Sequence, residues 1–199
     1  MKKQLTIVAY ALVMSVFARV VIAESNRGKI SFEGAVTDTT CEVVVNKQGS
    51  NATLKLPTVS SNLLKVEGDT AGRTYLSFEL ENCSLGGDQA NGKSSASVYF
   101  VAGESVNSAG RLNNTKATDS AKNVELQILD IDQAPLDLSV QVREQGATLV
   151  ALEDIKDQAG DVIASNSKAV IRHFVQYYAT GKAAAGGVTS DVEYEINYQ

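Results

Sequence analysis

The sequence has no tryptophan and contains only one histidine, two prolines and two cysteines among its 199 residues. A single imidazole leaves few options for catalytic sites that depend on histidine. The sequence also lacks zinc-type cysteine and histidine spacing, a phosphate-cradling glycine loop and a nucleotide-binding fingerprint. No stretch has the periodicity of a long amphipathic helix. These absences argue against a helical fold, a zinc module or a nucleotide-dependent enzyme.

Positive charge is scarce as well. The chain has 18 basic and 23 acidic residues, which gives a formal charge of −5. Removing the first 23 residues would take away Lys2, Lys3 and Arg19 but no acid, so 15 basic residues would face 23 acidic ones, for a charge of −8. A chain with this balance neutralises phosphates poorly. Nucleic acid and anionic lipid are therefore not expected as partners.

The residues that are present favour an all-β fold. The hydrophobic fraction of 44% and charged fraction of 21% are typical of a globular domain. Apolar and polar residues alternate in short runs, separated by Gly, Asn, Ser and Asp, and Leu54 and Leu56 run into Pro57, where strand pairing should end. The predicted strands are Gly28–Val36, Cys41–Val45, Tyr75–Cys83, Ser97–Ala102, Val124–Ile131, Leu136–Val142, Ala169–Ala179 and Asp191–Tyr198. About eight short strands without a linker predict a single β-sandwich domain.

The amino terminus has the pattern of a secretory signal peptide. Lys2 and Lys3 precede an apolar run, Leu5–Ala18, and residues 21–23 (VIA) suit signal peptidase, so the mature chain is expected to begin at Glu24. A cut after Ala18 remains an alternative. The apolar run of about 14 residues is shorter than the roughly 20 that a membrane-spanning helix needs. The sequence therefore predicts export.

Export also predicts a disulfide between Cys41 and Cys83. These are the two cysteines of the chain, and an oxidising compartment would pair them. Closing a loop of about 42 residues would stabilise the fold by about 4 kcal/mol in the chain-entropy model.

The single histidine is predicted to be structural. His173 shares one face of its strand with Ile171, Val175 and Tyr177, and no nucleophile motif accompanies it. We expect a partly buried, hydrogen-bonded strand histidine rather than a catalytic base. A secreted hydrolase is correspondingly disfavoured.

A group of acidic residues is predicted to form a solvated loop. Glu153, Asp154, Asp157 and Asp161 surround Gly160, but their spacing differs from that of a calcium-binding loop. No metal, cofactor or catalytic residue is therefore predicted for this chain.

Both ends of the mature chain alternate as strands do. Ile30, Phe32 and Val36 would share one face near the amino end, and the carboxyl end alternates apolar and polar residues over 192–198. Strands at termini invite pairing with another chain.

The sequence resembles the subunits of type 1-like fimbriae that the chaperone–usher pathway assembles. The resemblance spans essentially the whole mature chain. It rests on KISFEGAV at 29–36 followed by Cys41, FxLxxC at 78–83, QILD at 127–130, YYATG at 177–181, Gly186 as the fourteenth residue from the end, and the penultimate Tyr198. His173 departs from the family, which more often has an apolar residue there.

The resemblance implies an immunoglobulin-like β-sandwich that lacks its last strand and is completed by a donor strand from another subunit. It implies a signal peptide over 1–23, a donor-strand extension over 24–37 and a pilin domain over 38–199. The donor residues would be Ile30, Phe32, Gly34 and Val36. The edge strand that a chaperone or a neighbouring subunit contacts would use Gly186, Val192, Tyr194, Ile196 and Tyr198.

The same resemblance implies a structural, non-enzymatic role in an adhesive surface fimbria. The implied partners are identical or related pilin subunits, a periplasmic chaperone, an outer-membrane usher and a separate tip adhesin. A mature chain of 176 residues has no room for an additional lectin domain, so a shaft or adaptor subunit is expected and the major shaft subunit is favoured. The alternative from another class is a monomeric secreted carbohydrate-binding module, in which Gly28–Val36 folds into its own sandwich.

Overall fold

The computed structural model describes residues 30–31, 40–84, 95–160 and 162–199. Contacts divide the chain into two units, Met1–Ala35 and Val36–Gln199. In the first unit, Ile30 and Ser31 belong to no regular element. The second unit contains the strands β1 (Thr40–Val45), β2 (Thr70–Ser84), β3 (Ser95–Val101), β4 (Lys122–Leu129), β5 (Val150–Ala151), β6 (Glu153–Lys156), β7 (Val162–Ala184) and β8 (Glu193–Tyr198).

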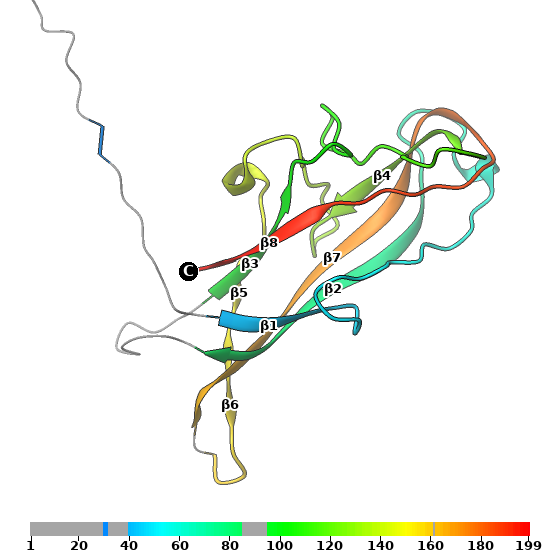
Figure 1. Cartoon of the computed structure of the whole chain (residues 1–199). Coiled ribbons are helices and arrows are strands. Elements are labelled where there is room, and N and C mark those ends of the chain that lie inside the picture. The colour runs from blue at the N-terminus through cyan, green and yellow to red at the C-terminus, as the bar shows by residue number, and fades with distance from the viewer. Residues whose placement is uncertain (1–29, 32–39, 85–94, 161) are drawn as a thin grey trace, which may run out of the picture. The chain divides into compact units, whose positions relative to one another are not determined.

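The strands form two antiparallel sheets, which confirms the predicted all-β sandwich. One sheet has the order β1-β2-β7-β4, and β6 also pairs with β7. The other has the order β5-β3-β8. Figure 1 shows β8 beside β3, with β2 and β7 side by side in the other sheet. Two short 3-10 helices, Ser61–Leu63 and Val142–Glu144, lie in the connections, and no helix of the described residues is long and apolar enough to cross a membrane.

The core lies between the sheets because alternation points every second side chain inward. Phe78 and Leu80 enter it from β2, Ile171 from β7, and Val98 and Phe100 from β3, and all five are at most 2% exposed. The rings of Phe78 and Phe100 meet edge to face with their centroids 6.1 Å apart, so they join the two sheets directly. Each large apolar side chain buried in this way contributes about 1.5–3 kcal/mol.

The prediction of a strand over Leu136–Val142 is wrong, because these residues form no regular strand. Leu136 and Leu138 are buried as the alternation indicates, but their backbone amides bond to separate partners, the carbonyls of Ile128 and Gly110. Pro135 precedes them with a single bridge to Leu129 and has no N–H to continue a ladder. An alternating pattern here marks core residues of an irregular segment.

Other strand boundaries also differ from the prediction. β2 and β7 are longer than expected, β4 ends at Leu129 rather than Ile131, and the short β5 was not predicted. The residues around Leu54 and Leu56 form no strand, although both side chains pack partly against the core. The long strands pair along most of their length, so pairing rather than local pattern sets their ends.

The acidic segment is partly a strand, which corrects the prediction of a loop. Glu153–Lys156 is β6 and pairs with β7, and the carboxylate of Asp154 accepts a hydrogen bond from the Ser167 hydroxyl at 3.2 Å. Pairing with the long β7 compensates for the modest strand propensity of this charged sequence. Asp161 lies outside the described residues.

His173 is more deeply buried than predicted, and its hydrogen-bond interaction with the Leu129 carbonyl falls outside normal geometry. The residue is 0% exposed, and neither ring nitrogen has a hydrogen-bond partner of normal geometry. Its ring packs edge to face against Phe78 and Phe100, with centroid distances of 5.9 and 5.3 Å. Burial lowers the pKa of His173, against smaller opposing effects of the Leu129 carbonyl and the Asp130 carboxylate.

This burial predicts a loss of stability in mild acid. The native state holds His173 neutral, whereas the unfolded chain protonates it as the pH falls below about 6.5, so the stability present above that pH is lost on acidification. The unfolding free energy should fall by up to about 1.4 kcal/mol per pH unit below pH 6.5. Thermal melts between pH 7.5 and 5 would measure it. His173→Leu should remove this part of the slope, and an identical slope in that variant would contradict the assignment.

Candidate functional site

The two edges of the three-stranded sheet differ in how their backbone groups are satisfied. On one edge, the short β5 pairs with the first two residues of β3. Further along the same edge of β3, the Gln145 side chain binds the Phe100 backbone. Gln145 donates to the Phe100 carbonyl at 2.6 Å and accepts from the Phe100 N–H at 3.1 Å. On the other edge, β8 pairs with β3 alone, and no described strand lies beyond it. β8 is therefore an open edge strand.

The register shows which backbone groups of β8 face the open side. Ser95 and Gln199 exchange both backbone hydrogen bonds, at 2.7 and 2.8 Å. Directly opposed residues of an antiparallel pair alternate between bonded and non-bonded positions. Counting back along the register, Tyr198, Ile196 and Tyr194 occupy the non-bonded positions opposite β3. Each of these three residues thus points one N–H and one C=O away from β3, where an added strand could bind them.

The side chains of the same residues line an incompletely covered part of the core. Tyr194, Ile196 and Tyr198 pack against the core but stay partly exposed. Partly buried apolar side chains also occur along β1 and in the loop that follows it. Eight of the partly buried residues lie on these two sides: Cys41, Val43, Leu54 and Leu56 on the β1 side, and Val192, Tyr194, Ile196 and Tyr198 on the β8 side. We call these eight residues the apolar rim.

Two tyrosines connect the two sides of the rim. The Tyr194 ring lies 4.8 Å from the Phe78 ring between centroids, and its hydroxyl donates to the Ser50 carbonyl at 2.7 Å. Burial raises the pKa of the Tyr194 phenol. Burial also raises the pKa of Tyr198, and a backbone hydrogen bond from Cys41 acts in the opposite direction. Tyr194 and Tyr198 thus link β8 to the β1 side.

The disulfide holds the β1 side of the apolar rim. Cys41 and Cys83 are bonded with an S–S distance of 2.09 Å, as predicted, and the bond links β1 to β2. Cys83 is fully buried, whereas Cys41 belongs to the apolar rim. The β1 side of the apolar rim is therefore tied covalently to the core strand β2.

Gly186 positions the segment that leads into β8. A Cβ atom at this residue would lie 2.3 Å from the Ala121 backbone nitrogen, so a larger residue would collide with main chain. The next residue exchanges backbone hydrogen bonds there, because Gly187 donates to Asp119 at 2.7 Å and accepts from Ala121 at 2.9 Å. Close packing against the main chain of Ser120 and Ala121 therefore explains why residue 186 is a glycine. The predicted contact of Gly186 with a chaperone or a neighbouring subunit stays a prediction.

Asn114 supports the same segment and was not identified from the sequence. Its amide donates to the Gly187 carbonyl at 3.0 Å, and its side-chain oxygen accepts from the Thr189 N–H at 3.1 Å. These partners lie more than 70 residues away in sequence, so no local pattern indicates the role.

The predicted donor residues are mostly beyond what the structure describes. Ile30 is described and is 77% exposed. Phe32, Gly34 and Val36 lie outside the described residues. The donor role of all four stays a prediction.

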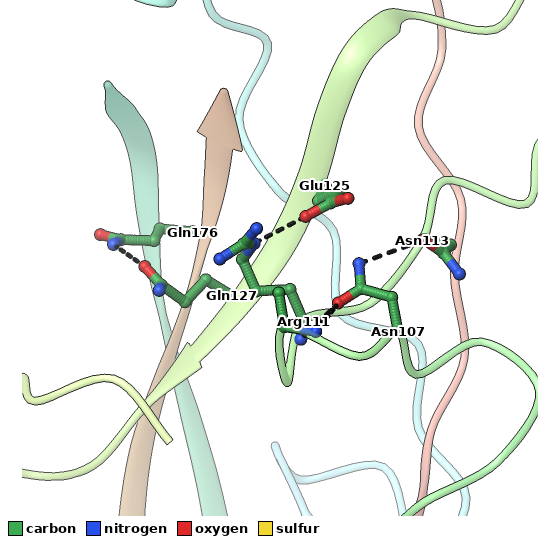
Figure 2. A network of polar contacts seen from close by, with 7 residues as sticks. Asn107, Arg111, Asn113, Glu125, Gln127 and Gln176 are labelled. Atoms are coloured by element: carbon green, nitrogen blue, oxygen red, sulfur yellow. Dashed lines mark hydrogen bonds and ion pairs between the residues drawn. The ribbon is translucent and has the colours of Figure 1, made fainter. Parts of the chain in front are cut away.

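The polar network in Figure 2 stabilises the structure around β4 and β7. Arg111 forms an ion pair with Glu125 at 2.6 Å and lies 4.0 Å from the centre of the Tyr178 ring. The Gln176 amide donates to Gln127 at 2.9 Å. The side chains in this network bind one another, and Arg111 is held by both an ion pair and a ring contact. Such an arrangement is structural rather than catalytic.

The described residues contain no group of three or more His, Cys, Asp or Glu side chains that could hold a metal ion. Within the same part of the chain, the His173 ring nitrogens have no hydroxyl or carboxylate partner of the kind a catalytic triad requires.

Comparison with known proteins identifies relatives with this architecture. The family model described as "Type-1 fimbrial protein, A" matches residues 56–199. The F17 fimbrial protein of Escherichia coli is 38% identical over 174 residues, which cover 86% of this chain and 87% of that protein. The major fimbrial subunit SMF-1 of Stenotrophomonas maltophilia is 33% identical over 177 residues, covering 88% of this chain and 95% of that protein.

Solved structures share the fold at low sequence identity. A chaperone–usher pilus, solved in work on rod uncoiling, matches with a TM-score of 0.54 and 16% identity, covering 88% of this chain and 97% of that chain. The P pilus rod subunit PapA matches with a TM-score of 0.52 and 14% identity, covering 79% of this chain and 99% of that chain. The family model spans most of the sequence, and two relatives are more than 30% identical over most of their length. The chain therefore belongs to the type-1 fimbrial protein family.

Proposed function

We propose that this chain is a structural subunit of a surface fimbria and that it polymerises by donor-strand exchange. The observation that carries the proposal is the open edge of β8, where three residues present unpaired backbone groups beside an apolar rim. Strand addition supplies both kinds of contact at once, because the main chain bonds to the edge while alternate side chains enter pockets. The amino-terminal extension of a neighbouring subunit is the proposed donor.

The proposed donor segment has the required length and pattern. Nine residues from Gly28 to Val36 span about 30 Å when extended at about 3.3 Å each, which exceeds the roughly 20 Å of the six-residue β8. Ile30, Phe32 and Val36 would each contribute about 1.5–3 kcal/mol on full burial. Gly34, between Phe32 and Val36, would allow close approach of the two backbones.

Ordering the donor offsets a large part of this gain. Fixing each backbone residue costs about 1–2 kcal/mol, whereas each hydrogen bond contributes about 0.5–1.5 kcal/mol. Completion of the acceptor's own core must therefore supply much of the driving force. The partly exposed rim residues are the groups that would gain cover.

The finer steps of assembly follow from the same edge. A periplasmic chaperone lends a strand to β8 after export, an outer-membrane usher receives the complex, and the next subunit's extension replaces the chaperone. The fimbria lies on the cell surface, and a separate subunit serves as its tip adhesin. The role is structural and not enzymatic.

The major shaft subunit is the proposed position in the fimbria, with a minor adaptor as the alternative. Family membership removes support from a monomeric carbohydrate-binding module. Immunoelectron microscopy of producing cells distinguishes shaft from adaptor, since label along the whole filament is expected for the shaft subunit. Label at isolated points would assign the adaptor role.

A synthetic donor peptide tests the proposal directly. A peptide covering Asn26 to Thr37, added to the mature subunit, should raise its melting temperature because only the folded state binds it. At 100 times Kd the stabilisation is about 2.7 kcal/mol, which corresponds to roughly 5–10 °C for a domain of this size.

A peptide with Phe32→Asp provides the matched control. It should give no shift, because it would bury an unpaired charge. Equal shifts with both peptides, or no shift with the natural one, would refute the proposed donor segment.

A further inference from the structure

The Tyr194 side chain reaches from β8 to the β1 side of the apolar rim. Tyr194 belongs to β8, and its ring packs against Phe78 of the other sheet. Its hydroxyl reaches the carbonyl of Ser50, which follows the tight turn after β1. One side chain therefore connects the open edge strand to the β1 side.

An added strand would lie beside this connection. A strand paired with β8 lies about 4.8 Å from it, on the side facing away from β3. The backbone of Tyr194 itself faces that side, and its phenol extends from β8 to Ser50. The inward side chains of an added strand would compete with the phenol for the same part of the apolar rim.

Tyr198 repeats the arrangement further along β8. Its inward side chain is partly buried at the rim, and a backbone hydrogen bond from Cys41 reaches its oxygen. The two tyrosines stand on the same face of the strand, four residues apart, and both contact the β1 side.

We propose that the Tyr194 phenol and the Ser50 carbonyl form a latch beside the open edge of β8, and that this latch opens before a donor strand can bind. The latch rests on the proposed donor-strand function and adds a kinetic role to it. Tyr194 partly covers the core of the unfilled subunit and slows insertion. When a donor strand binds β8, a row of main-chain hydrogen bonds to β8 replaces the single hydrogen bond from Tyr194 to Ser50.

The test measures the rate at which a fluorescent Asn26–Thr37 peptide enters the mature subunit, with the peptide in large excess. Tyr194→Phe keeps the ring and removes the hydroxyl, so insertion should become about 3- to 10-fold faster, the equivalent of one net hydrogen bond. The melting temperature of the filled complex should stay unchanged, whereas a merely structural role would lower it. Tyr194→Leu, which cannot reach Ser50, should also accelerate insertion.

Tyr75→Phe is the matched control. Its hydroxyl accepts a hydrogen bond from Arg172 at 3.0 Å, and the residue is exposed and lies outside the apolar rim. This variant should insert the peptide at the natural rate.

The outcomes separate the latch from the function on which it rests. Equal or slower insertion in both Tyr194 variants overturns the latch and leaves donor-strand exchange intact. No insertion into any of the chains overturns the donor-strand proposal and the latch with it.

Discussion

Deleting Ser25–Val36 is expected to convert the subunit into a chain terminator. The deletion removes the proposed donor residues but leaves β1, β8 and the disulfide in place. Such a subunit can still receive a strand along β8 but cannot complete a neighbour. Mixed with the full-length subunit, it should shorten filaments in proportion to its fraction, and alone it should form none.

Electron microscopy and size-exclusion chromatography measure this effect. The natural peptide should fill the groove of the truncated subunit and raise its melting temperature, which shows that the acceptor is intact. Filaments formed by the truncated chain alone would show that the extension is dispensable. A thermally stable monomer that ignores the peptide would show that the groove needs no donor.

Replacing Ile196 with Asp is expected to abolish accumulation of the subunit. Ile196 packs against the core from the middle of the open strand, opposite Val98 of β3. A carboxylate there would be taken from water without a partner, which costs several kcal/mol. The same charge would face any strand added to β8. We therefore expect loss of both periplasmic protein and surface filaments, measured by immunoblotting of cell fractions.

Glu195→Asp is the control for this substitution. Glu195 is exposed, and its neighbour in β3 is Tyr99, so this position already carries a carboxylate on the outward side of the same strand. Normal accumulation of this variant is expected. Normal fimbriae from Ile196→Asp cells would contradict the role assigned to the open edge.

Alternation along the sequence predicted the sandwich well because burial on one face imposes a period of two. The inward residues of β2, β7 and β8 follow it directly. The same rule failed at Leu136 and Leu138, since an irregular segment can also bury every second side chain. Local pattern reports which residues face the core, but it does not report whether their backbone joins a ladder.

The candidate site was only partly predictable for a related reason. The inward residues of β8 and the cysteine pair could be named from spacing and export. The bond from Tyr194 to Ser50 joins residues 144 positions apart, and Asn114 reaches Gly187 across 73. The deep burial of His173 likewise depends on which side chains from other strands pack around it, such as Phe78 and Phe100. Such contacts arise from the folded topology, so no periodic pattern in the sequence indicates them.

The open edge of β8 also determines the symmetry of any polymer built on it. Donor and acceptor would be different surfaces of one subunit, so the contact would be heterologous, and such contacts produce an open filament unless the rotation between subunits closes a ring. The filament would be polar, with an unfilled groove at one end and a free extension at the other. Main-chain bonds to β8 carry no side-chain identity, so the order of different subunits along the filament would depend on how well alternate side chains fit the rim.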